Sequence, residues 1–148
     1  DGYTLCFSAS IQILGRLVMR NPGYDPITDL APVARVGQGP LLMVMNQARP
    51  QQTLAEVLAA VRQNPRDWSF AVSSLGAAGH LATIEFTRQA GVEITQVPYR
   101  GTAPALTDVV AGNVQLMFDP ILATLPQVRE RRVRGLAITA RLRASISR

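Results

Sequence analysis

Short apolar runs alternate with helix-like segments through the last two-thirds of this chain, and this alternation limits the fold more than any other feature. Residues 54–63, for example, place apolar side chains on one helical face between two such runs. Because strands that alternate with helices over short connections form βαβ units, the pattern predicts an α/β fold, a mainly parallel sheet with helices on both faces. The runs expected to form strands in this region are residues 41–46, 68–74, 94–99, 114–119 and 133–140.

Two of the intervening helices have clear end signals. Thr53 and Glu56 form a capping box, in which the threonine hydroxyl accepts the amide three residues on and the glutamate reaches back. A second helix is expected over residues 80–90, and Gly91 is placed to end it in the left-handed conformation.

The two later helices are marked by proline and by capping residues. Thr102 is expected to cap a helix that carries Pro104 in its first turn and ends at Gly112. Asp119 is expected to cap the next helix, and Pro126 suggests that this helix starts late or bends.

The first 40 residues follow no such repeat. Residues 3–9 and 32–36 have strand-like patterns, and the turn formers of residues 21–26 predict a loop between them. Cys6 lies within the first of these runs, so we expect it to be buried. Since the chain opens at Asp1 in the middle of an apolar pattern, we expect it to be a fragment of a longer protein.

Composition excludes several classes. A chain of 148 residues that is 47% hydrophobic and 17% charged can bury one ordinary core and is not typical of disorder. The longest strong apolar run, residues 41–45, is far shorter than the ~18 residues of a membrane span. Cys6 and His80 are the only residues of their kinds, so neither an internal disulfide framework nor a multi-cysteine or two-histidine metal site is expected.

The net charge of +5 belongs to the C-terminal end. Residues 129–148 hold seven arginines and one glutamate, whereas the preceding residues hold eight arginines and nine acids. A basic tail of this kind could contact nucleic acid or anionic lipid. Because no aromatic residue is interleaved for base stacking, we interpret it as a solvated end and expect no nucleic-acid partner.

Candidate chemistry lies in the loops that follow the predicted strands. In open α/β sheets, ligands bind beyond the carboxyl ends of the strands. The loop of residues 73–80 joins hydroxyls and two glycines at a helix start, where free backbone N–H groups and the helix dipole favour an anion. Residues 99–104 and 118–120 should lie at the same edge of the sheet.

Other interpretations of these loops stay open. Small residues, Thr102 and Asp119 could serve as turn and cap chemistry alone. Gly76 and Gly79 match neither a dinucleotide fingerprint nor a Walker A motif. A triad of residue 73 or 74 with His80 and Asp119 is conceivable, but no G-x-S-x-G elbow is present, so catalysis is not expected.

Read in order, the sequence resembles the Bug family, the extracytoplasmic solute receptors of tripartite tricarboxylate transporters. The most specific segment is Val97-Pro98-Tyr99-Arg100-Gly101-Thr102-Ala103-Pro104-Ala105-Leu106-Thr107-Asp108. The other matching segments are residues 1–5, 24–33, 39–46, 73–81, 114–119 and 133–139, so that the resemblance covers roughly residues 1–140. Residues 141–148 depart from the family pattern.

The resemblance implies a two-lobed periplasmic-binding-protein fold of type II that closes on a small carboxylate. Residues 1–40 would be a remnant of the first lobe, residues 41–140 the second ligand-binding lobe and residues 141–148 a basic tail. Residues 41–46 and 133–140 would form the crossing hinge strands between the lobes.

The resemblance also implies a function and a set of ligand-binding residues. The function is capture of a dicarboxylate, tricarboxylate or amino acid for membrane transporter subunits in the periplasm, without catalysis, cofactor or metal. A ligand-sensing effector domain of a regulator is the alternative, and exposed first-lobe edges could also pair with a second copy. The implied ligand-binding residues are Ser73, Ser74, Gly76, Ala77, Ala78, Gly79, His80, Tyr99, Arg100, Gly101, Thr102 and Asp119.

Overall fold

The sheet and its helices occupy residues 41–138 of the computed structural model, which describes residues 2–9, 11–18 and 20–140. The described strands are β1 (Leu41–Asn46), β2 (Ser69–Val72), β3 (Thr95–Pro98), β4 (Leu116–Pro120) and β5 (Val133–Ile138). The helices are α1 (Ile11–Val18), α2 (Leu54–Gln63), the 3-10 turn η1 (Pro65–Asp67), α3 (Ala78–Ala90), α4 (Thr102–Ala111) and α5 (Ile121–Arg129). All five strands predicted after residue 40 are present, with ends that differ by up to two residues.

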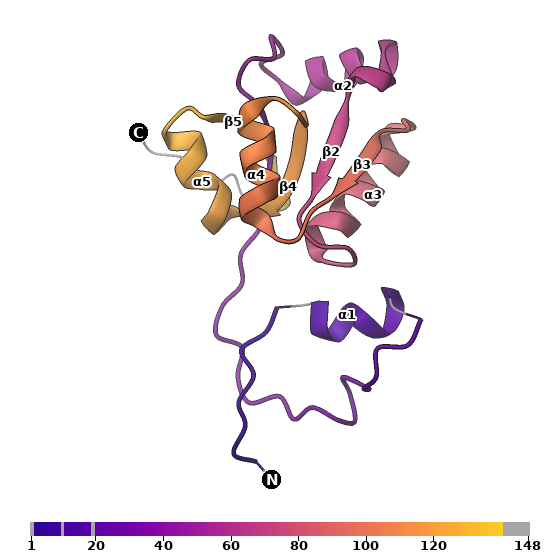
Figure 1. Ribbon diagram of the computed structural model, residues 1–148, viewed down its shortest axis with the longest axis vertical. Coiled ribbons are helices and arrows are strands. Elements are labelled where there is room, and N and C mark those ends of the chain that lie inside the picture. Colours follow the sequence, from indigo (N-terminus) through magenta and orange to yellow (C-terminus); the bar gives the residue numbers. More distant parts are fainter. Residues whose placement is uncertain (1, 10, 19, 141–148) are drawn as a thin grey trace.

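The five described strands form one sheet in the order β3-β2-β4-β1-β5 (Figure 1). Strand β2 runs parallel to β3 and to β4. Strand β1 runs antiparallel to both β4 and β5, so the other four strands share one direction. The predicted α/β fold with a mainly parallel sheet is confirmed.

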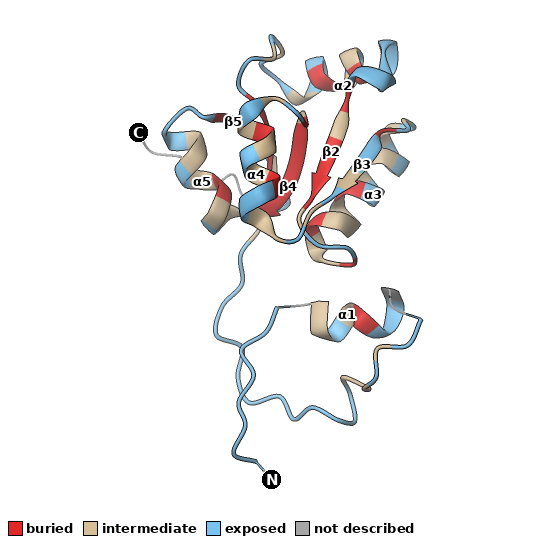
Figure 2. Ribbon diagram, in the orientation of Figure 1, coloured by how far each residue is buried: buried red, intermediate tan, exposed pale blue. Residues whose placement is uncertain are grey.

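Helices cover both faces of the sheet because side chains alternate along each strand. In β1, Met43 and Met45 pack on the face covered by α2 and α3, whereas Leu42 and Val44 pack on the face covered by α4 and α5. This double burial explains why β1 is a continuous apolar run rather than an alternating one. Figure 2 shows the buried residues concentrated in the central strands.

The predicted helix signals are largely confirmed. The Thr53 side chain accepts the N–H of Glu56, and the Glu56 carboxylate accepts the N–H of Gln52, one residue before the position that a standard capping box uses. Helices α3 and α4 end at glycines in the left-handed conformation, Gly91 and Gly112. Helix α5 begins directly at Ile121 and continues through the proline at position 126, so its start is not delayed.

The first 40 residues differ from expectation. Residues 3–9 and 32–36 form no strand, and Cys6 is exposed rather than buried. Tyr3 is 93% exposed and Phe7 is 87% exposed. An apolar alternation becomes a strand only beside a partner strand, and the described sheet lies elsewhere (Figure 1). Residues 21–26 form the predicted loop of turns and bends.

The end of β5 lies beside the start of β1. The Leu41 N–H donates to the Thr139 hydroxyl at 2.9 Å, and the Thr139 N–H donates to the Leu41 carbonyl at 3.0 Å. The chain therefore enters and leaves the sheet through two adjacent antiparallel strands, the pair expected to cross between lobes. The basic tail at 141–148 lies outside the described residues.

Candidate functional site

Two loops are joined where the parallel strands β2 and β3 end. The Tyr99 N–H donates to the Val72 carbonyl at 2.8 Å, and the Gly101 N–H donates to the Ser73 carbonyl at 2.8 Å. These bonds extend the β2–β3 pairing beyond the strands and bring residues 73 and 99–101 together. The expected clustering of these loops at one sheet edge is therefore present.

Asp119, at the end of β4, connects the same two loops through its side chain. Its carboxylate accepts the Ser73 hydroxyl at 2.7 Å through Oδ1 and the Thr102 hydroxyl at 2.6 Å through Oδ2. The residue is only 1% exposed. Hydrogen bonds to a carboxylate oxygen are among the stronger ones in proteins when the carboxylate is ionised.

This arrangement corrects two expected helix caps. The N-cap of α4 is Gly101 rather than Thr102, the N-cap of α5 is Pro120 rather than Asp119, and neither helix has a side-chain cap bond. The Thr102 hydroxyl and the Asp119 carboxylate bond each other instead, because β4 and α4 bring them within reach. Sequence spacing could not reveal this pairing across 17 residues.

Helix α3 starts against the backbone of β4. A β-carbon built on Gly79 would lie 2.4 Å from the Phe118 carbonyl oxygen and 3.9 Å from Asp119 Oδ1. Real β-carbons do not approach backbone this closely, so the contact requires glycine. The first turn of α3 is thereby fixed next to the Asp119 junction.

The first turn of α3 presents backbone donors. The helix's first i to i−4 hydrogen bond runs from the Leu81 N–H to the Ala77 carbonyl at 3.1 Å. The N–H groups of Ala78, Gly79 and His80 precede it and so have no acceptor within the helix. Such a terminus favours an anion through these donors and through the helix dipole.

His80 stabilises the loop rather than forming a catalytic pair. Its Nδ1 accepts the Gly76 N–H at 2.9 Å, which places the proton of a neutral imidazole on Nε2. The Ser73 hydroxyl donates to Asp119. The conceivable Ser–His–Asp relay is therefore not assembled among these residues, and the sequence offered only the i, i+4 spacing as a signal for the Gly76–His80 contact.

Tyr99 lies half-buried against α4. Its hydroxyl donates to Asp108 Oδ2 at 2.6 Å, a partner that sequence reasoning did not identify. Burial, together with this bond, raises the pKa of the Tyr99 phenol to about 12. Hydrogen bonds from Tyr99 and Asn113 lower the pKa of the Asp108 carboxyl.

The remaining predicted residues line the rim of these loops. Ser74 and Arg100 are exposed, whereas Ala77 and Ala78 are half-buried. Leu75, at the tip of the first loop, is a large apolar residue that is 62% exposed. The tip of this loop thus exposes apolar surface.

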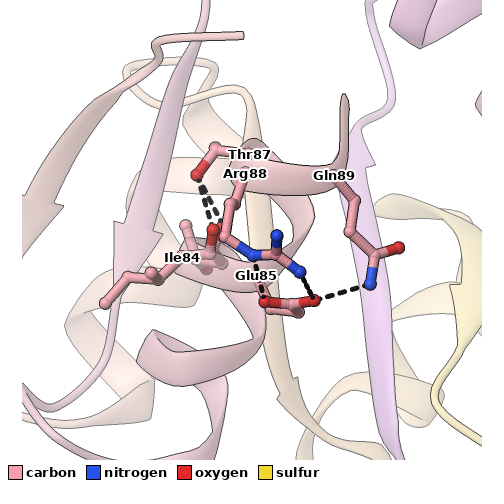
Figure 3. A network of polar contacts seen from close by, with 6 residues as sticks. Ile84, Glu85, Thr87, Arg88 and Gln89 are labelled. Atoms are coloured by element: carbon pink, nitrogen blue, oxygen red, sulfur yellow. Dashed lines mark hydrogen bonds and ion pairs between the residues drawn. The ribbon is translucent and has the colours of Figure 1, made fainter. Parts of the chain in front are cut away.

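The outer face of α3 carries a separate polar network, drawn in Figure 3. Glu85 accepts two hydrogen bonds from Arg88, at 2.8 and 2.6 Å, and one from Gln89 at 2.6 Å. The hydrogen bonds from Arg88 and then Gln89 lower the pKa of Glu85 to about 2. This network is exposed and lies at the i, i+3 and i, i+4 spacings that stabilise a helix.

Among the residues that the structure describes, no group of three or more histidine, cysteine, aspartate or glutamate residues is arranged to hold a metal ion. Within the same residues, no helix has the length and apolar character needed to cross a membrane.

Loops grouped at the carboxyl ends of parallel strands lie where open α/β sheets bind their ligands. Comparison with known proteins identifies the family of the chain. The family model of the tripartite tricarboxylate transporter family receptor (TctC) matches residues 1–146, and the chain belongs to this family. The resemblance to Bug receptors is thereby confirmed.

Individual relatives agree with this assignment. Protein BugT of Bordetella pertussis is 35% identical over 140 residues, which cover 93% of this chain and 43% of BugT. The structure of R. palustris Rpa4515 with adipate matches with a TM-score of 0.86 and 40% identity, covering 90% of this chain and 45% of that one. MatC (Rpa3494) from Rhodopseudomonas palustris with bound malate matches with a TM-score of 0.79 and 28% identity, covering 90% and 44%.

These comparisons define the class of the chain and its extent. Members of the family are periplasmic solute-binding receptors rather than enzymes, and their fold is the type II-like periplasmic-binding fold. The chain spans less than half the length of the curated relatives and solved structures described above.

Proposed function

We propose that residues 41–140 of this chain form the second ligand-binding lobe of a receptor that captures a small carboxylate for a tripartite tricarboxylate transporter. The observation that carries the proposal is the first turn of α3, where three backbone N–H groups precede the helix's first internal hydrogen bond. A carboxylate bound there would satisfy these donors and interact favourably with the helix dipole.

The same donors and the solved relatives support a carboxylate as the proposed class of ligand. Backbone amides can hold a carboxylate without a dedicated arginine, and hydroxyls and bridging water add further bonds. The similar structures are described with adipate and with malate, both of which are small dicarboxylates. A dicarboxylate is therefore the first class to test.

Several residues would have separate roles in this site. The N–H groups of Ala78, Gly79 and His80 would contact the carboxylate. Gly76 supports the loop through His80. The exposed Ser74 and Arg100, with Ala77 and Gly101, would border the solute.

The proposal also covers the division of the chain, its location and its partner. Residues 41–140 form the proposed lobe, residues 1–40 belong with a first lobe and residues 141–148 form a basic tail. The periplasm is the proposed location, and the membrane subunits of the transporter are the proposed partner. Closure of the two lobes over the solute would present it to those subunits.

The test is an amide NMR titration of this chain with acetate, adipate, malate and citrate. With half of a cleft, binding near millimolar is expected, which corresponds to about −4 kcal/mol. Saturable shifts should concentrate at residues 76–80 and 101–102. The neutral compound adipamide, of similar length, should produce no such shifts.

Two results would contradict the proposal. Equal shifts with adipate and adipamide would remove the role of the negative charge. Shifts that spread over the exposed arginines at positions 62 and 66, and not at the start of α3, would indicate nonspecific anion binding instead.

A further inference from the structure

We infer that Asp119 is a positioning residue, which holds the two ligand loops at a fixed spacing and does not itself contact the solute. The inference rests on the proposed function, since it concerns how the same site is held ready. It assigns to Asp119 a role different from the direct ligand contact that the family resemblance implies.

The geometry joins three strand ends through one carboxylate. Each Asp119 oxygen accepts a hydroxyl from a different loop, Ser73 after β2 at 2.7 Å and Thr102 after β3 at 2.6 Å. A third element, the first turn of α3, is placed beside Asp119 by the close approach of Gly79 to Phe118. Displacement of this carboxylate would therefore alter both loops together.

Burial and bonding separate this role from ligand contact. Asp119 is 1% exposed, and each of its oxygens is already bonded to a hydroxyl. A carboxylate offers only acceptors, so it cannot donate a hydrogen bond to an anionic solute. The donors that suit such a solute lie on the neighbouring backbone.

Asp119 also connects the loops to the crossing strands. In the β1–β4 pairing, Asp119 lies opposite Leu42, and Leu42 lies opposite Ile138 of β5. Asp119 thus lies on the strand next to β1, which with β5 forms the pair of strands through which the chain enters and leaves the lobe.

The test compares two substitutions of one partner. Thr102→Val keeps the shape of the side chain and removes the hydroxyl, whereas Thr102→Ser keeps the hydroxyl. Amide NMR spectra of this chain are recorded without ligand and then with adipate. Thermal unfolding of both variants identifies a temperature at which each is folded.

The expected result is an effect on the opposite loop. Thr102→Val should shift the amide signals of residues 74–80, which lie on the other loop, and should weaken adipate binding about tenfold. Thr102→Ser should leave the amide signals of residues 74–80 unshifted and the adipate affinity within about twofold of that of the unmodified chain. Ser73→Ala should produce the reciprocal shifts at residues 101–103.

The contradicting results are equally specific. Unchanged signals at residues 74–80 in Thr102→Val would overturn the positioning role, as would equal losses of affinity in the valine and serine variants. If the unmodified chain does not bind adipate, the proposed function fails for this probe, and the shifts between loops still decide whether Asp119 holds them.

Discussion

Gly79 and Phe118 approach so closely that a β-carbon on Gly79 would lie 2.4 Å from the Phe118 carbonyl oxygen. Helix α3 can therefore begin directly against β4 only because residue 79 has no side chain. The contact places the backbone donors of α3 next to the buried Asp119. Gly79, for which sequence reasoning left ligand binding and turn chemistry open, thus has a packing role in the site.

Gly79→Ala should destabilise the fold. The added methyl group must displace the backbone of α3 or β4, and overpacking of this kind costs about 1–3 kcal/mol. Urea unfolding should show a lower midpoint with an unchanged slope. Gly37→Ala is the matched control because nothing lies within 4 Å of its β-carbon position, and an equal loss in both variants would contradict the account.

Asn46 should stabilise the end of helix α4 from a neighbouring strand. Its side-chain amide donates to the Val109 carbonyl at 2.8 Å and the Val110 carbonyl at 3.1 Å, and the residue is buried. Asn46→Ala leaves these carbonyls without that donor and should cost about 1–3 kcal/mol of unfolding free energy.

A second substitution at the same position separates lost donors from lost packing. Asn46→Asp keeps the shape but presents oxygens to the Val109 and Val110 carbonyls, so it should destabilise the fold more than alanine does. Asn64→Ala, at an exposed position without a side-chain cap hydrogen bond, should change stability by less than ~0.5 kcal/mol. Equal unfolding midpoints for Asn46→Asp and the unmodified chain would refute the role of the amide.

Acid titration should show Glu85 protonating well below its ordinary pKa of 4.5, at about 2. Because the folded pKa is lowered, this group favours folding above pH 4.5, and its contribution is lost as the pH falls toward 2. Carboxyl NMR measures the midpoint directly.

The cause of that shift can be tested by removing its main donor. Arg88→Ala should raise the Glu85 pKa toward 4.5, because Arg88 donates two of the three hydrogen bonds that the Glu85 carboxylate accepts (Figure 3). Arg66→Ala, at an exposed position elsewhere, should leave the midpoint unchanged. A midpoint near 4.5 in the unmodified chain would show that the network does not persist in solution.

Sequence reasoning could predict the strands and helices after residue 40 because their signals are local. The capping box at Thr53 and the terminal glycine at position 91 each act within a few residues. The strand expected at residues 3–9 was wrong because alternation indicates only a capacity for pairing. Whether a partner strand lies alongside depends on residues far away in the chain.

The candidate site was predictable only in its location. The strand-to-helix loops gathered at one sheet edge as expected, since parallel strands end on the same side. The bonds from Ser73 and Thr102 to Asp119 join residues 46 and 17 positions apart, and nothing local signals them. Helix capping was the simpler local interpretation, and tertiary contacts replaced it.

The central claim is that backbone donors of α3 bind the solute, and Ala78→Pro tests it most directly. Ala78 is the first residue of the helix, where proline is well tolerated, and Ala77 already has the extended backbone that precedes proline comfortably. The substitution therefore removes one N–H donor with little change to the fold. Ala78→Gly, which keeps the N–H, is the control.

The measurement is adipate affinity by amide NMR for the unmodified chain and both variants. Loss of a hydrogen bond to a charged group is worth about 1.5–3 kcal/mol, so Ala78→Pro should weaken binding at least about tenfold. Ala78→Gly should bind within about threefold of the unmodified chain. Equal affinity of the proline variant and the unmodified chain would contradict the account.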